Sequence, residues 1–370
     1  MFEIGLEHPF NFLSDEYAQL FASARATAFQ HPVWLDRIYR DLAPRLNAEP
    51  VVVTVRWRHT GRLAMLLPLL RRRHGMLRVI EFADLQVSDY AAPVADDHTF
   101  ARLAADRLAR EKIRALLKPY DLIRIQKLAD EAMPLEQLFG VSRRTPMAMS
   151  AHAVSLEPPY PQWEAQSISA SYRKELDKKR RQLDRKGAVR FECSQTPEQV
   201  TSTFEAMRAY RRERFDSGDL LQQPLYFDFY RDIALQESDA GLCRTYTLSI
   251  DGRPIGGVWG LVHQGRFLVL LCGFDLATYK NQSIGALTFT DVARDCIERR
   301  DTVLDFTIGD ESYKRLFGAQ PSTLWMISAA GTPLGTLANV VADNVPWAVK
   351  VAKEVLNRRR ETAPAQAKEA

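Results

Sequence analysis

Two stretches of this chain share one pattern. Residues 53–70 read VTVRWRHTGRLAMLLPLL, and residues 246–262 read YTLSIDGRPIGGVWGLV. In each stretch a Gly-Arg turn, at Gly61 or at Gly252, separates two apolar runs, which is typical of a β-hairpin. Because one supersecondary pattern occurs twice at a long interval, the sequence predicts two copies of one α/β unit.

The segments around the two hairpins repeat the same order. Each hairpin follows stretches with helical periodicity and precedes a predicted strand, a helix and a second strand. In the first half we predict helices over 15–28, 31–47 and 97–118 and further strands over 77–82, 121–126 and 147–156. In the second half we predict helices over 168–187, 197–215, 225–237 and 283–299 and strands over 188–193, 242–250, 254–262, 266–273 and 302–307.

A proline-rich run, EPPYP at 157–161, predicts a linker between the two halves. We therefore expect an N-terminal domain over 1–156 and a C-terminal domain over 157–335. The remaining segment, 336–370, contains a predicted basic amphipathic helix over 342–360 and a tail that we expect to be disordered. That helix is interpreted either as a contact with anionic lipid or as a terminal helix packed on the core.

The composition bounds the class of protein. Hydrophobic residues make up 46% and charged residues 26% of the 370, which indicates a globular chain with a large core. The net charge of +4 does not by itself indicate nucleic-acid binding, and we expect none. The four cysteines form no CxxC pair, so we expect a reducing compartment and no metal site. With no signal peptide or membrane-spanning run, we expect a cytoplasmic protein with at most peripheral contact at the inner membrane face.

Residues 305–318, DFTIGDESYKRLFG, place several ionisable groups directly after a predicted strand. A carboxylate near a lysine can act as a base or orient an amine, and a phenol can donate a proton. Asp310, Glu311, Tyr313 and Lys314 are therefore candidate catalytic residues. The alternative is that Asp310 caps a helix, that Glu311 favours the helix dipole and that Lys314 is solvated.

A second candidate site lies where the strand at 266–273 ends and a helix begins near Ser283. Free backbone amides at a helix start, with Gly285 allowing close approach, form an anion site suited to a pyrophosphate. The alternative is a helix capped by Ser283 with nothing bound.

From Thr245 to Gly318 the chain resembles the C-terminal half of the CelD/BcsL-type acetyltransferases. These belong to the GNAT superfamily and are associated with cellulose and other exopolysaccharides. The matching motifs are the Asp251-Gly252 turn, GFD at 273–275, Y-x-x-x-S-x-G at 279–285 and DF-x-x-GDE-x-YK at 305–314. The first half resembles the same group in HPVWL at 31–35, LPL at 67–69 and SDYAAPV at 88–94.

This resemblance implies a tandem GNAT-like α/β fold, with mixed sheets flanked by helices, like that of the FemAB aminoacyltransferases. It also implies a donor, acetyl-CoA or a longer acyl-CoA, and an amine or hydroxyl acceptor. The donor pyrophosphate is expected on Gln282, Ser283, Gly285 and Ala286. Leu287 stands where the family usually has a small residue, and Ile284 where relatives often carry proline.

An acyl transfer needs a base and oxyanion stabilisation, because a protonated amine cannot attack a thioester. We expect strand 268–273 to hold the pantetheine and Asp310 and Glu311 to orient or deprotonate the acceptor. Lys314 is expected to stabilise negative charge, and Tyr313 to donate a proton to the thiolate. Acceptor contacts are predicted from across the domain interface and along the second half: Ser88, Asp89, Tyr90, Asp275, Tyr279 and Asp305. The alternative for residues 88–90 is an ordinary loop.

The expected function is CoA-dependent acylation, as an N-acetyltransferase, of an amino sugar in an exopolysaccharide or a lipid-linked precursor. Two alternatives stay open: N-acylation of a long-chain lipid base, as in bacterial ceramide synthases, and a degenerate GNAT fold that binds a ligand and regulates polysaccharide export. The basic helix at 168–187 would attract a phosphate-bearing acceptor. It is equally interpreted as a solvated helix with pairs such as Glu175 and Lys179.

Overall fold

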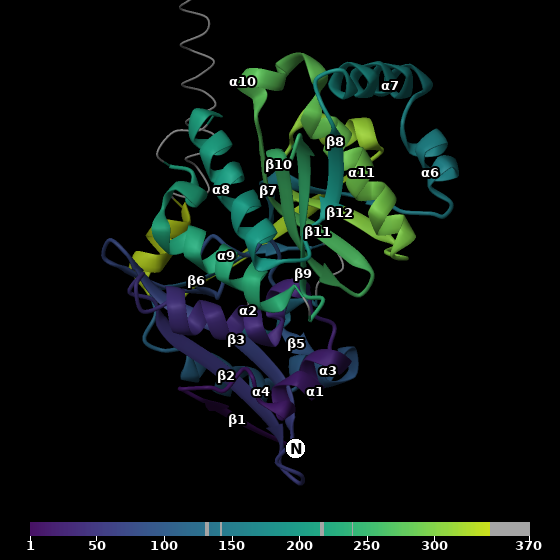
Figure 1. Ribbon diagram of the computed structural model, residues 1–370. Helices are drawn as coiled ribbons and strands as arrows, with labels where there is room; N and C mark the ends of the chain where they lie inside the picture. Colours follow the sequence, from purple (N-terminus) through teal and green to yellow (C-terminus); the bar gives the residue numbers. More distant parts are fainter. Residues whose placement is uncertain (130–132, 141–142, 215–217, 239, 341–370) are drawn as a thin grey trace, which may run out of the picture.

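The computed structural model describes residues 1–129, 133–140, 143–214, 218–238 and 240–340. One mixed sheet of 13 strands runs through both halves of the chain (Figure 1). Its order is β1-β2-β3-β4-β6-β13-β7-β12-β11-β10-β9-β8, and β5 pairs with β3. The strands are β1 Phe2–Leu6, β2 Glu49–Trp57, β3 Leu63–His74, β4 Leu77–Phe82, β5 Val94–Ala95, β6 Leu122–Leu128, β7 Arg143–Ser155, β8 Val189–Cys193, β9 Cys243–Ile250, β10 Arg253–His263, β11 Arg266–Phe274, β12 Val303–Ile308 and β13 Gln320–Ala330.

Helices cover both faces of this sheet. Short 3-10 or π turns join some of them: η1 Ala28–Gln30, η2 Ile38–Leu42, η3 Leu220–Gln222, η4 Lys280–Gln282 and η5 Ser312–Phe317. The helices are α1 Asp15–Ser23, α2 Pro32–Arg37, α3 Asp97–Ala105, α4 Arg107–Leu116, α5 Leu135–Phe139, α6 Tyr160–Ser167, α7 Ala170–Asp184, α8 Pro197–Arg214, α9 Pro224–Glu237, α10 Leu276–Tyr279 and α11 Ile284–Glu298. The predicted fold class, a mixed sheet flanked by helices, is confirmed.

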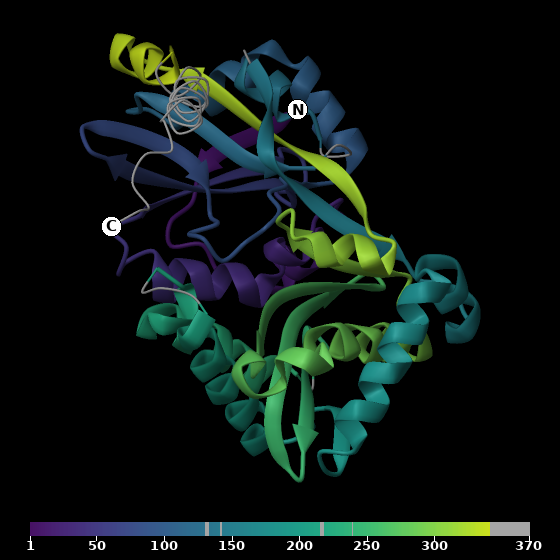
Figure 2. The ribbon, with the colours of Figure 1, turned by 90° about the horizontal axis from the view of Figure 1, so that it is seen from above.

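The succession of antiparallel and parallel strand pairs is the same from either end of the sheet. Each half contributes three antiparallel pairs in succession, β1-β2-β3-β4 and β8-β9-β10-β11, and the last strand then pairs in parallel with a later one: β4 with β6, and β11 with β12. The halves exchange their last strands, because β13 lies between β6 and β7 while β7 also pairs with β12 (Figure 2, yellow beside blue). The two hairpins predicted from the sequence are present, and Gly61 and Gly252 have φ of +71° and +78°.

Several predicted boundaries were wrong. The helix predicted over 97–118 divides at Asp106, because the Asp106 side chain accepts hydrogen bonds from the N–H groups of Leu108 and Ala109 and starts a new helix. The α-helix predicted over 31–47 covers only Pro32–Arg37 and continues as the η2 turn. The run expected to be a linker leads directly into α6 at Tyr160. Strands β1 and β13 were not predicted, and the helix predicted over 342–360 lies outside the described residues.

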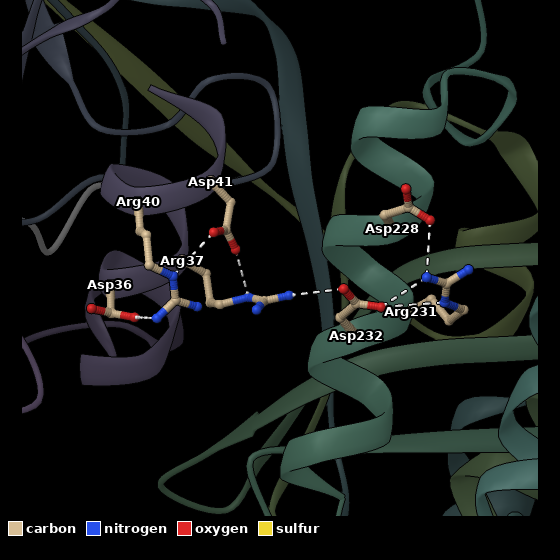
Figure 3. A network of polar contacts seen from close by, with 7 residues as sticks. All are labelled: Asp36, Arg37, Arg40, Asp41, Asp228, Arg231 and Asp232. Atoms are coloured by element: carbon tan, nitrogen blue, oxygen red, sulfur yellow. Dashed lines mark hydrogen bonds and ion pairs between the residues drawn. The ribbon is translucent and has the colours of Figure 1, made fainter. Parts of the chain in front are cut away.

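The two halves share one apolar core and one charged network. Trp34 of α2 stacks on Trp259 of β10 with ring centroids 6.4 Å apart. Arg37 of α2 bonds Asp232 of α9 at 3.3 Å and Asp41 at 2.9 Å, so an ion pair joins the halves (Figure 3). The halves are thus packed as one body, which fixes the N-terminal loops against the strands of the C-terminal half.

Two histidines at this junction predict how stability depends on pH. The ring of Phe21 contacts both His31 and His263, and burial lowers the pKa of His31 to about 4 and lowers that of His263. The unfolded chain therefore binds more protons between about pH 4 and the ordinary histidine pKa. We expect the free energy of unfolding to fall as pH drops from 7 to 4. Urea unfolding at each pH checks this, and in the double variant His31→Gln, His263→Gln the acid loss should shrink; an unchanged slope would contradict it.

Candidate active site

Strands β11 and β12 separate after three paired positions. They pair at Arg266–Val303, Phe267–Leu304 and Leu268–Asp305, and then diverge. The register of β12 on β7 also breaks after Asp305, where Thr307 has a φ of +53°. A cavity of about 300 Å³ lies between the diverging strands, which we call the donor wedge. Its lining includes Val269, Leu270, Phe274, Phe306, Thr307 and Ile308.

Helix α8 closes one side of the donor wedge. It packs directly on β11, where a Cβ at Gly273 would lie 2.7 Å from the Met207 backbone, so glycine permits this approach. Arg211 of α8 donates to the Cys272 carbonyl at 3.0 Å and pairs with Asp219. The wedge therefore has a polar wall on one side and an aromatic wall, with Phe306 and Tyr313, on the other.

The start of α11 lies at the open end of the donor wedge. A Cβ added at Gly285 would lie 3.3 Å from the Phe274 ring, which lines the wedge. Ser283 has a left-handed φ of +51° and its side chain forms no capping hydrogen bond, so the alternative of a Ser-capped helix does not hold. Leu287 is buried in the core and does not narrow the loop. The backbone amides of Gln282–Ala286 thus lie at the start of α11, close to the lining of the donor wedge.

Helix α7 runs beside this loop (Figure 1). Lys179 donates to the Asn281 carbonyl at 2.6 Å, and Arg180 pairs with Asp291 of α11. Two cations of the predicted basic helix therefore hold the loop in place. Others, among them Lys178 and Arg181, are exposed.

The ammonium group of Lys314 points into the protein backbone. The side chain is 3% exposed, and Nζ donates to the carbonyls of Ile308 at 3.1 Å and Gly309 at 2.9 Å. It also bonds Glu311 at 2.9 Å. These contacts hold the turn that follows β12, where Gly309 has a φ of +124°. Lys314, which was predicted to stabilise negative charge on a substrate, thus bonds carbonyl and carboxylate oxygens of its own turn.

Asp310, Glu311 and Tyr313 do not converge on one point. Asp310 accepts a bond from the buried His152 at 3.0 Å, and this bond lowers the pKa of Asp310. The Asp310 side chain is 45% exposed and lies outside the donor wedge lining. Glu311 and Tyr313 do line the wedge, and Tyr313 stacks on Phe289.

The loop at 88–90 meets β12 at the point where the strands separate. Tyr90 Oη donates to Asp305 Oδ1 at 2.9 Å, and Arg266 bonds Asp305 Oδ2 at 2.9 Å. Asp305 is fully buried, and the Thr307 N–H also bonds its carboxylate. Tyr90 and Asp305, both predicted to contact the acceptor, thus lie together across the two halves.

Asp89 lies beside Thr307 at the same point. Burial raises the pKa of the Asp89 carboxyl group, and the negative charges of Asp305 and Asp84 raise it further. The nearby Lys127 and a hydrogen bond to Thr307 lower this pKa. The Thr307 hydroxyl also donates to the Val269 carbonyl at 2.9 Å, which bridges the diverging strands. Asp89 thus lies beside the point where β11 and β12 separate, outside the lining of the donor wedge.

The remaining predicted acceptor residues have structural partners. Ser88 is buried and accepts a hydrogen bond from the Trp34 indole at 3.0 Å. Asp275 caps α10 by accepting from the Thr278 N–H at 2.9 Å. Tyr279 ends α10, next to the 282–286 loop.

Sequence reasoning missed Arg211, Arg266, Thr307 and His152. Arg266 is the first residue of the strand predicted over 266–273, and a charged residue at a strand end could have been singled out from the sequence. Nothing in the pattern pointed to the others, because Arg211 reaches the wedge through the Cys272 carbonyl, 61 positions away, His152 bonds Asp310, 158 positions away, and the place of Thr307 depends on the bulge in β12.

Residues 170–315 match a family model described as an acetyltransferase (GNAT) domain. No curated protein matches the chain. Among solved structures, FemX aligns with a TM-score of 0.58 at 12% identity over 87% of this chain and 96% of FemX. L-PGS from Bacillus licheniformis aligns with a TM-score of 0.55 at 12% identity over 92% of this chain and 98% of that one. At 12% identity the two comparisons show a similar fold and nothing finer.

The domain match and the fold together support an acyl-CoA-dependent acyltransferase. The matched segment contains the donor wedge, the 282–286 loop and β12. Within the described residues, no helix is long and apolar enough to cross a bilayer, and no cluster of potential ligands would hold a metal ion.

Proposed function

We propose that the chain transfers an acetyl group from acetyl-CoA to the amine of an amino sugar, within an exopolysaccharide or a lipid-linked precursor. The observation that carries this proposal is the donor wedge: β11 and β12 diverge at Leu268–Asp305, and the start of α11 lies at the open end. Pantetheine can pair with the free edge of β11 as an added strand does, with its pyrophosphate on the 282–286 amides.

In this arrangement the thioester lies at the apex of the wedge, next to Thr307 and Asp89. We propose Asp89 as the base that takes the proton of the amine, and Tyr90, through Asp305, as a positioning residue. Glu311 and Tyr313 line the wedge and are proposed to contact the donor. Lys314 and Asp310 are proposed to shape the turn through their bonds to backbone and to His152.

The amino-sugar acceptor follows from the resemblance to CelD/BcsL-type enzymes. N-acylation of a long-chain lipid base would need a continuous apolar channel. The donor wedge and the cavity at the junction of the halves have mixed polar and apolar linings, which favours the sugar.

Donor binding is tested at Gly285. We expect Gly285→Glu to weaken acetyl-CoA binding on the order of 100-fold, because the side chain fills the approach and opposes the phosphates. Gly285→Gln, which adds the same bulk without charge, separates the two causes. Calorimetric titration with acetyl-CoA measures the affinities, and thermal unfolding checks that both variants fold. Equal affinity in wild type and Gly285→Glu would place the donor elsewhere.

A further inference from the structure

A second cavity, of about 350 Å³, lies where the two halves meet, and we call it the junction cavity. Its walls come from the segment after α1, the loop after β4, β7 and the first residues of β11 and β12. Tyr90 and Arg266, which both bind Asp305, form part of its lining. On β12, Val303 lines the junction cavity and Phe306 lines the donor wedge, so the two cavities lie before and after the buried Asp305 along this strand.

The two cavities adjoin along β11. Leu268 lines the junction cavity, and the next two residues, Val269 and Leu270, line the donor wedge. Between them lies the point where β11 and β12 separate, with Thr307 and Asp89 beside it. A molecule in the junction cavity would thus approach a thioester at the apex from the side opposite the pantetheine.

The lining of the junction cavity includes two cationic side chains, each paired with one carboxylate, Asp97 or Asp305. Arg25 and Arg266 bring two guanidinium groups, one from each half. Arg266 bonds Asp305 through Nη1, makes no other side-chain bond to the described residues, and is 40% exposed. The partner of Arg25, Asp97, is 70% exposed and lies outside the cavity lining, so water screens its charge. His263 also lines the cavity, and its Nε2 has no partner among the described residues.

Small side chains leave the volume of this cavity free. Alanines from both halves form much of its wall: Ala26, Ala28, Ala91, Ala92 and Ala153. Space beside two cationic side chains fits a compact polar ring that carries an anionic group.

We infer that the junction cavity binds the acceptor and that this acceptor is an amine carrying an anionic group, a phosphate or a carboxylate. The inference rests on the proposed function. The anionic group lies on Arg25 and Arg266, and the amine points to the apex. The neutral amine forms the C–N bond, the C–S bond breaks, the amine proton passes to Asp89 and CoA leaves as the thiolate.

Three probes that differ in charge test this inference: glucosamine, glucosamine 6-phosphate and muramic acid. Binding to the full chain is measured by calorimetry without donor, and acetyl transfer by release of free CoA. We expect at least one anionic probe to bind about 10-fold or more tighter than glucosamine, as charge-assisted hydrogen bonds do. Tighter binding of glucosamine 6-phosphate would identify the anionic group as a phosphate, and tighter binding of muramic acid would identify it as a carboxylate. The preference should shrink as salt is raised.

The variant Arg25→Gln should remove most of this preference. The matched control is Arg107→Gln, which also breaks an exposed ion pair, with Glu111, but on the outer helix α4. Equal binding of all three probes, or a preference that Arg25→Gln leaves intact, would overturn the inference. Acetyl-CoA binding, measured separately, keeps the two claims apart: its absence contradicts the proposed function, while normal donor binding without an anionic preference contradicts this inference alone.

Discussion

Replacing Asp89 by Asn is expected to lower the acetyl-transfer rate by about 10²–10⁴, because a general base typically contributes that much. Acetyl-CoA affinity should stay within about threefold of wild type, since Asp89 lies beside Thr307 but outside the lining of the donor wedge. The rate is measured in single turnover with saturating donor. In wild type it should rise with pH as the Asp89 carboxyl, whose pKa is raised, ionises, and Asp89→Asn should lose this limb.

The matched control for Asp89 is Asp84→Asn. Asp84 also faces Lys127, at 3.0 Å, but does not contact Thr307. We expect Asp84→Asn to keep most of the rate. A wild-type rate and pH profile in Asp89→Asn would rule out Asp89 as the base.

Replacing Lys314 by Met is expected to lower the free energy of unfolding by roughly 3 kcal/mol, because it leaves backbone carbonyls at a buried turn without their donor. Methionine keeps the length of the side chain but has no N–H. Urea unfolding, monitored by fluorescence and circular dichroism, measures the loss.

Glu311→Gln is the control for Lys314→Met. The Glu311 side chain is 53% exposed, so losing its charge should cost less than about 1 kcal/mol. A Lys314→Met variant with wild-type stability and no acetyl transfer would contradict this prediction. Lys314 would then act on the substrate, as the spacing of 305–318 predicts.

The local elements were predictable because their signals are local. The Gly-Arg turns, alternating apolar runs and helical periodicity identify the two hairpins and α11 within a few residues. The run 157–161 was read as a linker because proline breaks regular structure, yet proline is also tolerated in the first turn of a helix, and Pro161 lies in the first turn of α6.

The features that define the site were less predictable because they depend on distant contacts. Strand β13 is half-exposed and has weak alternation, and only its pairing with β6 and β7 makes it a strand. Lys314 looked available from the sequence, since no pattern shows that the turn at Gly309 brings three carbonyls to its ammonium group. Conversely, the SDY motif was linked to Asp305 only through family resemblance, 215 positions apart.

The central claim is that acyl-CoA binds between β11 and β12, and a crystal structure of the chain with desulfo-CoA, which cannot transfer an acyl group, tests it most directly. The N-terminal half contains the alternative site for CoA. There β4 and β6 also diverge, after the pair Ile80–Ile123, beside a cavity of about 560 Å³. We predict pantetheine along β11 from Val269 to Gly273, with the pyrophosphate on the amides of Gln282–Ala286. Desulfo-CoA bound between β4 and β6, with the donor wedge empty, would contradict the claim.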